Sequence, residues 1–136
     1  MVKELDIAAV KDNLDAVLRF VEEQLENTGC SPKTQMQIEL AVEEIFINIA
    51  SYAYYPETGK AMIRMEIKPE QREVSIIFID LGIPYNPLAK ADPDVTLPFA
   101  QRKIGGLGIF LVKKNMDDIH YEYVNGSNVL TIIKKI

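Results

Sequence analysis

The sequence has one cysteine, one histidine and no tryptophan among its 136 residues. Cys30 alone cannot form an internal disulfide, and together with His120 it supplies too few soft ligands for a zinc site. A bound metal ion would therefore need oxygen ligands. No apolar run approaches the ~20 residues that span a bilayer, and the first residues lack the apolar stretch and cleavage site of a secretory signal. We therefore expect a soluble, cytoplasmic protein without a membrane partner.

The charge balance leans to the acidic side, with 20 acidic against 15 basic residues and a net charge of -5. An acidic chain is a poor nucleic-acid binder, so proteins and small molecules are the expected partners. The chain is 48% apolar and 26% charged, which is typical of globular domains. This length fits a single domain over residues 1–136, with no internal repeat.

Hydrophobic periodicity predicts three helices and five strands. Apolar residues at helical spacing predict helices over about 9–26 and 32–53, and a third helix follows the glycine cluster near 105. Alternating or apolar runs predict strands at about 2–7, 61–68, 73–80, 121–125 and 129–136, most of them in antiparallel hairpins. This order predicts an α+β two-layer sandwich, in which helices cover one face of a mixed, mostly antiparallel sheet.

Residues 81–104 show no usable period and contain four of the seven prolines. A loop of this length is uncommon inside a compact domain, and where it occurs it is often a lid over an active site. A disordered insertion is the alternative, and the segment alone does not decide between the two.

The second predicted helix carries a polar strip between apolar flanks. At about 100° per residue, Gln37, Glu44, Asn48 and Ser51 fall on one strip. An acid and an amide between apolar walls are costly to bury unless something satisfies them. A bound ligand would do so, and a solvent-facing seam of mutual hydrogen bonds is the alternative.

Two further segments have both a binding and a structural interpretation. Asp80 ends an apolar strand and enters the turn at 81–84, where a carboxylate could meet an amino group or simply bond the turn amides. Gly105, Gly106 and Gly108 open a helix, where free backbone N–H groups suit a phosphate, although a tight turn would also explain them. The motif G-x-x-x-x-G-K-[ST] and the early G-x-G-x-x-G fingerprint are both absent, which excludes Walker-type and Rossmann sites.

Taken together, these segments resemble three sequence boxes of one family. E44-I-F-I-N48 resembles the N-box, D80-L-G82-I-P84 the G1 box and G105-G106-L-G108 the G2 box. The chain resembles, over nearly its whole length, a GHKL-type (Bergerat-fold) ATPase domain. Within that superfamily it is most similar to the stand-alone bacterial anti-sigma-factor serine kinases and their histidine-kinase-like ATP-binding relatives.

The resemblance implies a role for the residues of the first two boxes. Glu44 would be the general base of a kinase, and Asn48 would hold Mg²⁺ between the phosphates of ATP. Asp80 would accept the adenine amino group, and Gly82 would let the base approach the backbone. Pro84 stands where histidine kinases commonly have a second glycine, and it stiffens the turn.

The resemblance also implies that the third box encloses the triphosphate, through Gly105, Gly106, Leu107 and Gly108, while a lid over about 81–104 closes over it. Arg102 and Lys103 are candidates to neutralise the γ-phosphate from this lid. Tyr52 departs from the family pattern, because many kinase-type relatives have histidine there. His120 is expected to be a structural or surface residue.

Two functions follow as expectations from the resemblance. One is an ATP- and Mg²⁺-dependent serine/threonine kinase that phosphorylates a small anti-sigma antagonist protein. Sequestration of a sigma factor by the same protein is an open addition to this function. The alternative is a regulatory module that binds ATP or ADP without transferring phosphate. An α+β interaction domain without nucleotide is a third reading. A homodimer is an open option, since relatives often dimerise.

Overall fold

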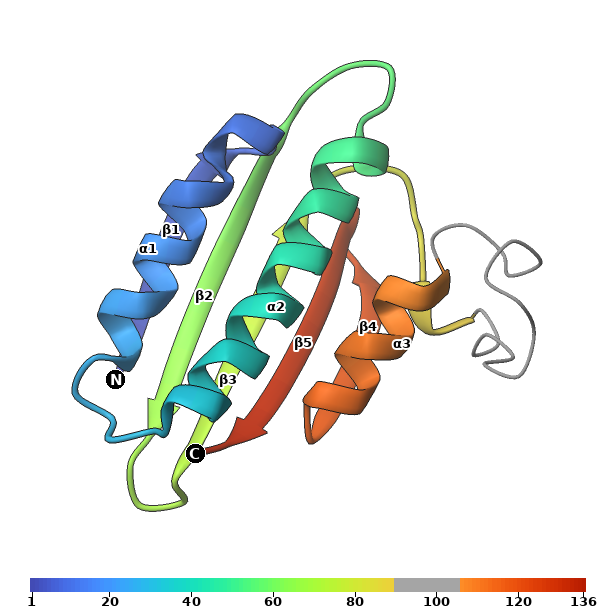
Figure 1. Ribbon diagram of the computed structural model, residues 1–136. Coiled ribbons are helices and arrows are strands. Elements are labelled where there is room, and N and C mark those ends of the chain that lie inside the picture. Colours follow the sequence, from blue (N-terminus) through green and yellow to red (C-terminus); the bar gives the residue numbers. More distant parts are fainter. Residues whose placement is uncertain (90–105) are drawn as a thin grey trace.

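The computed structural model describes residues 1–89 and 106–136, which form two layers (Figure 1). Its sheet has five strands in the order β1-β2-β3-β5-β4, and each pairing is antiparallel. The strands are β1 (Val2–Ala8), β2 (Lys60–Lys68), β3 (Glu73–Asp80), β4 (Asp118–Val124) and β5 (Ser127–Lys135). The helices are α1 (Leu14–Leu25), α2 (Pro32–Asn48) and α3 (Gly106–Asn115), with short helical turns η1 (Lys11–Asn13), η2 (Ile49–Ala53) and η3 (Pro87–Ala89).

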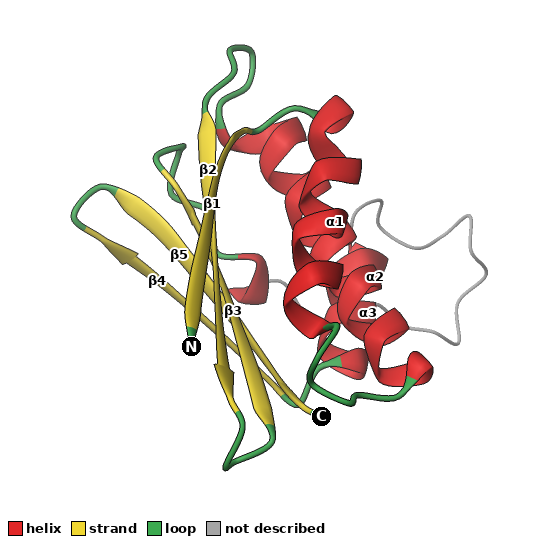
Figure 2. Cartoon of the chain, turned by 90° about the vertical axis from the view of Figure 1, so that its left-hand side faces the viewer, coloured by secondary structure: helices red, strands yellow, loops and turns green. Residues whose placement is uncertain are grey.

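The three α-helices cover one face of the sheet, and the other face carries no helix of the described chain (Figure 2). This arrangement confirms the predicted α+β two-layer sandwich. Every pairing of the described strands is antiparallel, and β3 and β5 are neighbours in the sheet although α3 and β4 lie between them in the chain. No helix in the described ranges is long and apolar enough to cross a membrane.

Helix boundaries follow local chemistry more closely than periodicity alone. Ser31 caps α2 by accepting a hydrogen bond from the Thr34 amide at 3.1 Å, and Pro32 occupies the first helical position. The segment predicted as one helix over 9–26 begins instead with the 3₁₀ turn η1, and the α-helix starts only at Leu14. The segment predicted as one helix over 32–53 is α-helical to Asn48 and continues as the π-helix η2.

The core lies between the helix layer and the sheet. In β2 every second residue from Ala61 to Ile67 is buried, as expected for a strand with one covered face. Fully buried side chains from both layers fill this space: Val17, Val21, Ile38, Val42, Phe46, Ile63, Ile76 and Ile132. The same layers meet around the C-terminal half of α2, the end of β3 and the start of α3, and these elements build the site described next.

Candidate functional site

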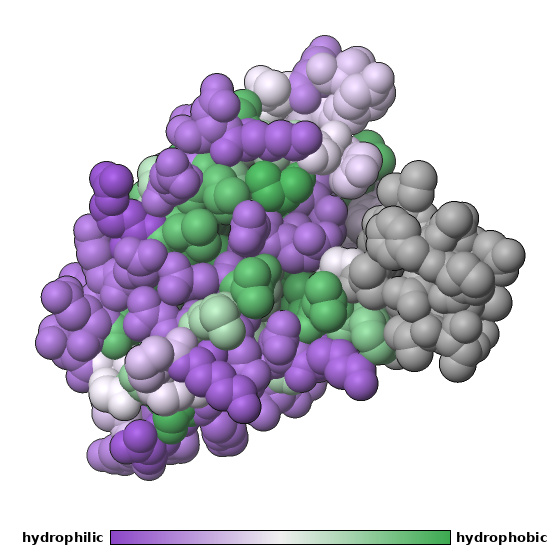
Figure 3. Space-filling view, in the orientation of Figure 1, coloured by the Kyte–Doolittle hydropathy of each residue, from purple (hydrophilic) through white to green (hydrophobic). Residues whose placement is uncertain are grey.

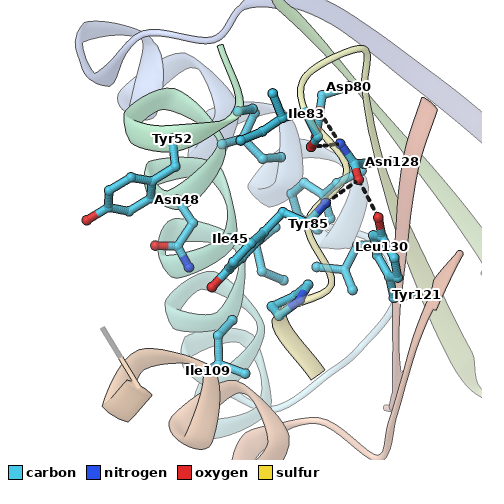
Figure 4. Close-up of a pocket in the computed structure, with 14 residues that line it drawn as sticks. Ile45, Asn48, Tyr52, Asp80, Ile83, Tyr85, Ile109, Tyr121, Asn128 and Leu130 are labelled. Carbon is cyan, nitrogen blue, oxygen red and sulfur yellow. Dashed lines mark hydrogen bonds between the residues drawn. The ribbon is translucent and has the colours of Figure 1, made fainter. Parts of the chain in front are cut away.

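A pocket opens between the helix layer and the sheet (Figure 4). The space between its lining atoms amounts to roughly 600 Å³ when the open solvent at its mouth is included. Apolar residues make up most of its wall, and a few polar groups converge on it. The lining residues include Ile45, Asn48, Ile49, Tyr52, Phe78, Asp80, Ile83, Tyr85, Ile109, Tyr121, Asn128 and Leu130.

Asp80 and Asn128 form a buried polar pair at the sheet side of the pocket, each 6% exposed. One carboxylate oxygen of Asp80, Oδ1, accepts hydrogen bonds from the Gly82 amide at 2.9 Å and from Asn128 Nδ2 at 3.0 Å. No group of the described residues donates to the other oxygen, Oδ2. Asp80 therefore has acceptor capacity left for a ligand that donates a hydrogen bond.

Asn128 holds the segment that follows β3. Its Nδ2 also donates to the Ile83 carbonyl at 2.8 Å, while its Oδ1 accepts from the Tyr85 amide at 3.1 Å and from the Tyr121 hydroxyl. Both ends of the carboxamide are thus engaged, and Figure 4 shows the bonds converging on it. Among the described residues no fully buried side-chain nitrogen or oxygen lacks a partner, so the network holds Asp80 in place while its Oδ2 keeps its acceptor capacity.

Gly82 allows the turn after β3 to touch the end of η2. The Ile83 amide donates to the Ala53 carbonyl at 2.9 Å, and a Cβ built on Gly82 would overlap that same carbonyl. Only glycine fits this close approach of two backbones. The structure thus gives Gly82 a role in bringing two protein segments together, in addition to any contact with a ligand.

Tyr54 joins the same turn to β2. Its hydroxyl accepts a hydrogen bond from the Leu81 amide at 2.8 Å and donates one to the Lys60 carbonyl at 2.6 Å. Burial is the main cause that raises the pKa of the Tyr54 phenol above its ordinary value. The group therefore stays protonated at neutral pH and can serve as donor and acceptor together.

Glu44 and Asn48 lie one turn apart on α2, facing the start of α3. A Cβ built on Gly108 would overlap the Glu44 carboxylate, so the first turn of α3 passes directly beside that group. Burial raises the pKa of Glu44, the charge of Glu43 raises it further, and the hydrogen bond with Asn48 opposes the rise. The site thus holds a carboxyl group whose pKa is shifted towards the working range of a general base.

The structure brings several of the predicted site residues together. Asn48 and Asp80 line the pocket, Glu44 lies one turn from Asn48, and Gly82 follows Asp80. Pro84 lies exposed in the segment after Gly82. Gly106, Leu107 and Gly108 form the first turn of α3, so the glycines lie within the helix. Arg102, Lys103 and Gly105 lie outside the described residues, as does the predicted lid beyond residue 89.

Other predictions have mixed outcomes. Gln37 and Ser51, predicted to share the polar strip of α2, do not line the pocket. The side chain of His120 is 63% exposed beside Asp118, which agrees with the predicted surface position. Asn128, Tyr54 and Tyr121 were not singled out from the sequence. One sequence feature could have indicated Asn128. It is a polar residue that shares the alternation of β5 with the buried apolar residues Leu130 and Ile132.

The family model described as histidine kinase-like ATPase domain matches residues 7–134. The chain belongs to this family. The histidine kinase-like ATPase domain described here is 28% identical over 102 residues to "Serine/threonine-protein kinase BtrW" of Bordetella bronchiseptica, covering 75% of this chain and 71% of that protein. It is 26% identical over 118 residues to "Serine-protein kinase RsbW" of Bacillus cereus, covering 85% and 74%.

The solved structure of the RsbU and RsbW domains of a Mycobacterium tuberculosis protein matches this ATPase domain with a TM-score of 0.66 at 14% identity. The match covers 98% of this chain and 32% of that chain, so our chain spans about a third of its length. This likeness confirms the fold.

The donor set of this histidine kinase-like ATPase domain is compatible with a nucleotide and Mg²⁺. The described residues contain no group of three acidic, histidine or cysteine side chains that could hold a metal ion by themselves. Mg²⁺ keeps several waters and often needs only one or two protein oxygens plus phosphate oxygens. The single amide oxygen of Asn48 in the pocket wall fits that demand, and the free Asp80 oxygen fits an amino donor.

Proposed function

We propose that the protein is an ATP- and Mg²⁺-dependent serine/threonine kinase of the anti-sigma-factor type, acting in the cytoplasm as one domain over residues 1–136. The observation that carries the proposal is the position of Glu44. Its carboxyl group lies one turn from Asn48 and against the first turn of α3, with a raised pKa. A partly buried acid beside a pocket with few polar groups suits proton transfer during catalysis.

The pocket residues divide between the two ends of the nucleotide. Asp80 accepts the adenine amino group through its free oxygen, and Gly82 lets the base lie against the turn. Asn48 holds Mg²⁺ through its amide oxygen, and the bound ion neutralises charge on the phosphates. At the other end, backbone N–H groups of Gly106, Leu107 and Gly108 face the phosphates, since helix N-termini favour anions.

Three residues outside the described ranges complete this assignment. Gly105 extends the glycine segment around the triphosphate, and Arg102 and Lys103 supply positive charge to the γ-phosphate from the lid over about 81–104. The support for Gly105 is the resemblance of residues 105–108 to the third box, and the support for Arg102 and Lys103 is their basic charge directly before it.

In the transfer step, Glu44 takes the proton from a serine or threonine hydroxyl of the protein substrate. The hydroxyl oxygen forms a bond to the γ-phosphorus, and the bond from that phosphorus to the β,γ-bridging oxygen breaks. ADP leaves with the electron pair of the broken bond. Phosphoryl transfer depends mainly on positioning and charge stabilisation, so one base and a well-oriented nucleotide suffice.

The proposed substrate is a small anti-sigma antagonist protein, and a sigma factor is a proposed second partner. The support is the resemblance to anti-sigma-factor kinases, together with relatives that are themselves named serine-protein kinases. A homodimer is compatible with this assignment.

The test compares the wild-type chain with Glu44→Gln. We expect the variant to bind Mg-ATP in calorimetry with an affinity within about threefold of wild type and to transfer no label from radioactive ATP to candidate antagonist proteins. Glu57→Gln, an exposed carboxylate, is the matched control and should transfer normally. Full transfer by Glu44→Gln would remove this residue from the mechanism. Nucleotide binding by the wild type without any transfer would favour the regulatory module instead.

A further inference from the structure

A second surface feature lies on the N-terminal half of α2, away from the nucleotide pocket. It is a groove between α1 and α2, called here the α1–α2 groove, and it is lined by Leu18, Cys30, Pro32, Gln35, Met36, Glu39, Leu40 and Glu43. The pocket uses the other half of α2, from Ile45 onward. A ligand in this groove would therefore leave the nucleotide site open.

Two large apolar side chains that line the α1–α2 groove are exposed to solvent. Met36 is 56% exposed and Leu40 is 50% exposed, one helical turn apart on α2. Figure 3 shows apolar surface gathered over the helix layer and surrounded by hydrophilic residues. Apolar patches with a polar rim are typical of protein contact sites.

Carboxylates of both helices lie around these apolar side chains, and none of them pairs with a lysine or arginine of the described residues. Glu22 of α1 and Glu39 of α2 lie close enough to hydrogen-bond to each other, and Glu43 lies one turn beyond Glu39. Burial first, and then the contact with Glu22, raises the pKa of Glu39, while Gln35 at 3.3 Å lowers it. In the described ranges, no lysine or arginine forms an ion pair with these three carboxylates. Positive charge supplied by a partner would relieve this repulsion.

The shape of the groove suits a helix. Two packed helices present a furrow into which the side-chain ridge of a third helix fits. The part of α2 that lines the furrow, from Pro32 to Glu43, extends about 16 Å along the helix axis, equivalent to three turns. Helices docked in such grooves place apolar anchors at spacings of three and four residues.

We propose that the α1–α2 groove docks an amphipathic helix of a partner protein, whose apolar side chains cover Met36 and Leu40 and whose flanking lysines and arginines pair with Glu22, Glu39 and Glu43. This site is separate from the nucleotide chemistry proposed above. Its occupation requires neither ATP nor a protein phosphate acceptor.

The test uses a synthetic peptide of about 14 residues, helical in sequence, with leucines on one face and lysines on both flanks. A second peptide has glutamate in place of each lysine. Binding to the full chain is followed by ¹H–¹⁵N chemical shifts. Because Cys30 is the only cysteine and lines the groove, its reaction rate with a thiol reagent gives a second reading.

We expect the basic peptide to shift amides of α1 and α2, to slow the reaction of Cys30 and to bind more weakly at high salt. Addition of Mg-ATP should not displace it. The double variant Met36→Ala/Leu40→Ala should weaken binding about tenfold or more. Glu22→Gln/Glu39→Gln/Glu43→Gln should weaken it about tenfold at low salt.

Matched controls separate the groove from general effects. Leu111 on α3 is also 50% exposed, so Leu111→Ala tests a lost apolar side chain outside the groove. Glu57→Gln/Glu70→Gln/Glu122→Gln removes the same charge from exposed positions elsewhere. Both controls should bind the basic peptide as the wild type does.

Four outcomes would overturn the proposal. They are no binding of the basic peptide, equal binding of the acidic peptide, chemical shifts outside α1 and α2, and equal weakening by the control variants. Self-association of the chain that Leu40→Ala abolishes in sedimentation would assign the groove to a second copy instead. Each result is independent of whether the protein transfers phosphate.

Discussion

Asn128 Nδ2 lies 3.0 Å from Asp80 Oδ1, although the two residues are 48 positions apart in the chain. This bond connects neighbouring strands β3 and β5 at the pocket end of the sheet. The second oxygen of Asp80, Oδ2, accepts no hydrogen bond from the described residues. The pocket is therefore organised by a residue outside the three family boxes.

Asn128→Ala should lower both stability and nucleotide affinity. The substitution removes the hydrogen bonds that Asn128 makes to Asp80, the Ile83 carbonyl and the Tyr85 amide, and each lost bond costs about 0.5–1.5 kcal/mol. We expect the free energy of unfolding to fall by about 2–4 kcal/mol in urea titrations. Calorimetry should show at least tenfold weaker ATP binding. Asn86→Ala, outside this network, should leave affinity within about twofold, and an unaltered affinity in Asn128→Ala would remove its positioning role.

Tyr54→Phe tests the connection between the turn after β3 and the start of β2. The variant keeps the ring and loses the hydroxyl that bonds the Leu81 amide and the Lys60 carbonyl. We expect a loss of about 1–2 kcal/mol in the free energy of unfolding and weaker ATP binding. Tyr55→Phe is the matched control, because Tyr55 is 79% exposed and its hydroxyl forms no hydrogen bond with the residues that the structure describes. If both variants behave alike, the Tyr54 hydroxyl does not position the turn.

Gly108→Ala sets helix propensity against steric overlap. In an open helix position, alanine would stabilise by about 1 kcal/mol relative to glycine. Here the added Cβ overlaps the Glu44 carboxylate, the far end of a flexible side chain, so Glu44 must rotate away and we expect most of that gain to be lost. Thermal unfolding measures the change. In Glu44→Ala nothing has to move, so adding Gly108→Ala to it should give the full gain of about 1 kcal/mol. A single variant Gly108→Ala stabilised by the same amount would contradict the close contact.

The raised pKa of Glu44 predicts how stability changes with pH. In the folded state the proton is held more tightly than in the unfolded chain, whose carboxyl has its ordinary value of 4.5. The favourable contribution of Glu44 to the free energy of unfolding is fully present below pH 4.5 and is lost as the pH rises through the folded-state pKa. At a pH above the folded-state pKa, Glu44→Gln should therefore be more stable than the wild type. This advantage should disappear near pH 4. Urea titrations across pH measure this difference, and Glu57→Gln, at an exposed position away from the site, is the control variant.

Local sequence patterns anticipated much of the fold. Alternating apolar residues in β2 predicted one buried face, and Ser31 with Pro32 marked the start of α2, because these features depend on neighbours in the chain. The change to a 3₁₀ turn before Leu14 and to a π-helix after Asn48 was not visible. Both continue a helical pattern, and periodicity does not separate one helix type from another.

The sequence by itself determined the order of helices and strands and contained the three boxes that led to Glu44, Asn48 and Asp80. Only the tertiary structure decided that Asn128 bonds Asp80 and that Gly108 lies against Glu44. The physical reason is that local patterns reflect hydrogen bonding and burial within one element. Contacts between distant elements depend on how whole layers pack. The type of a single polar residue or a glycine does not show which distant residue it will contact.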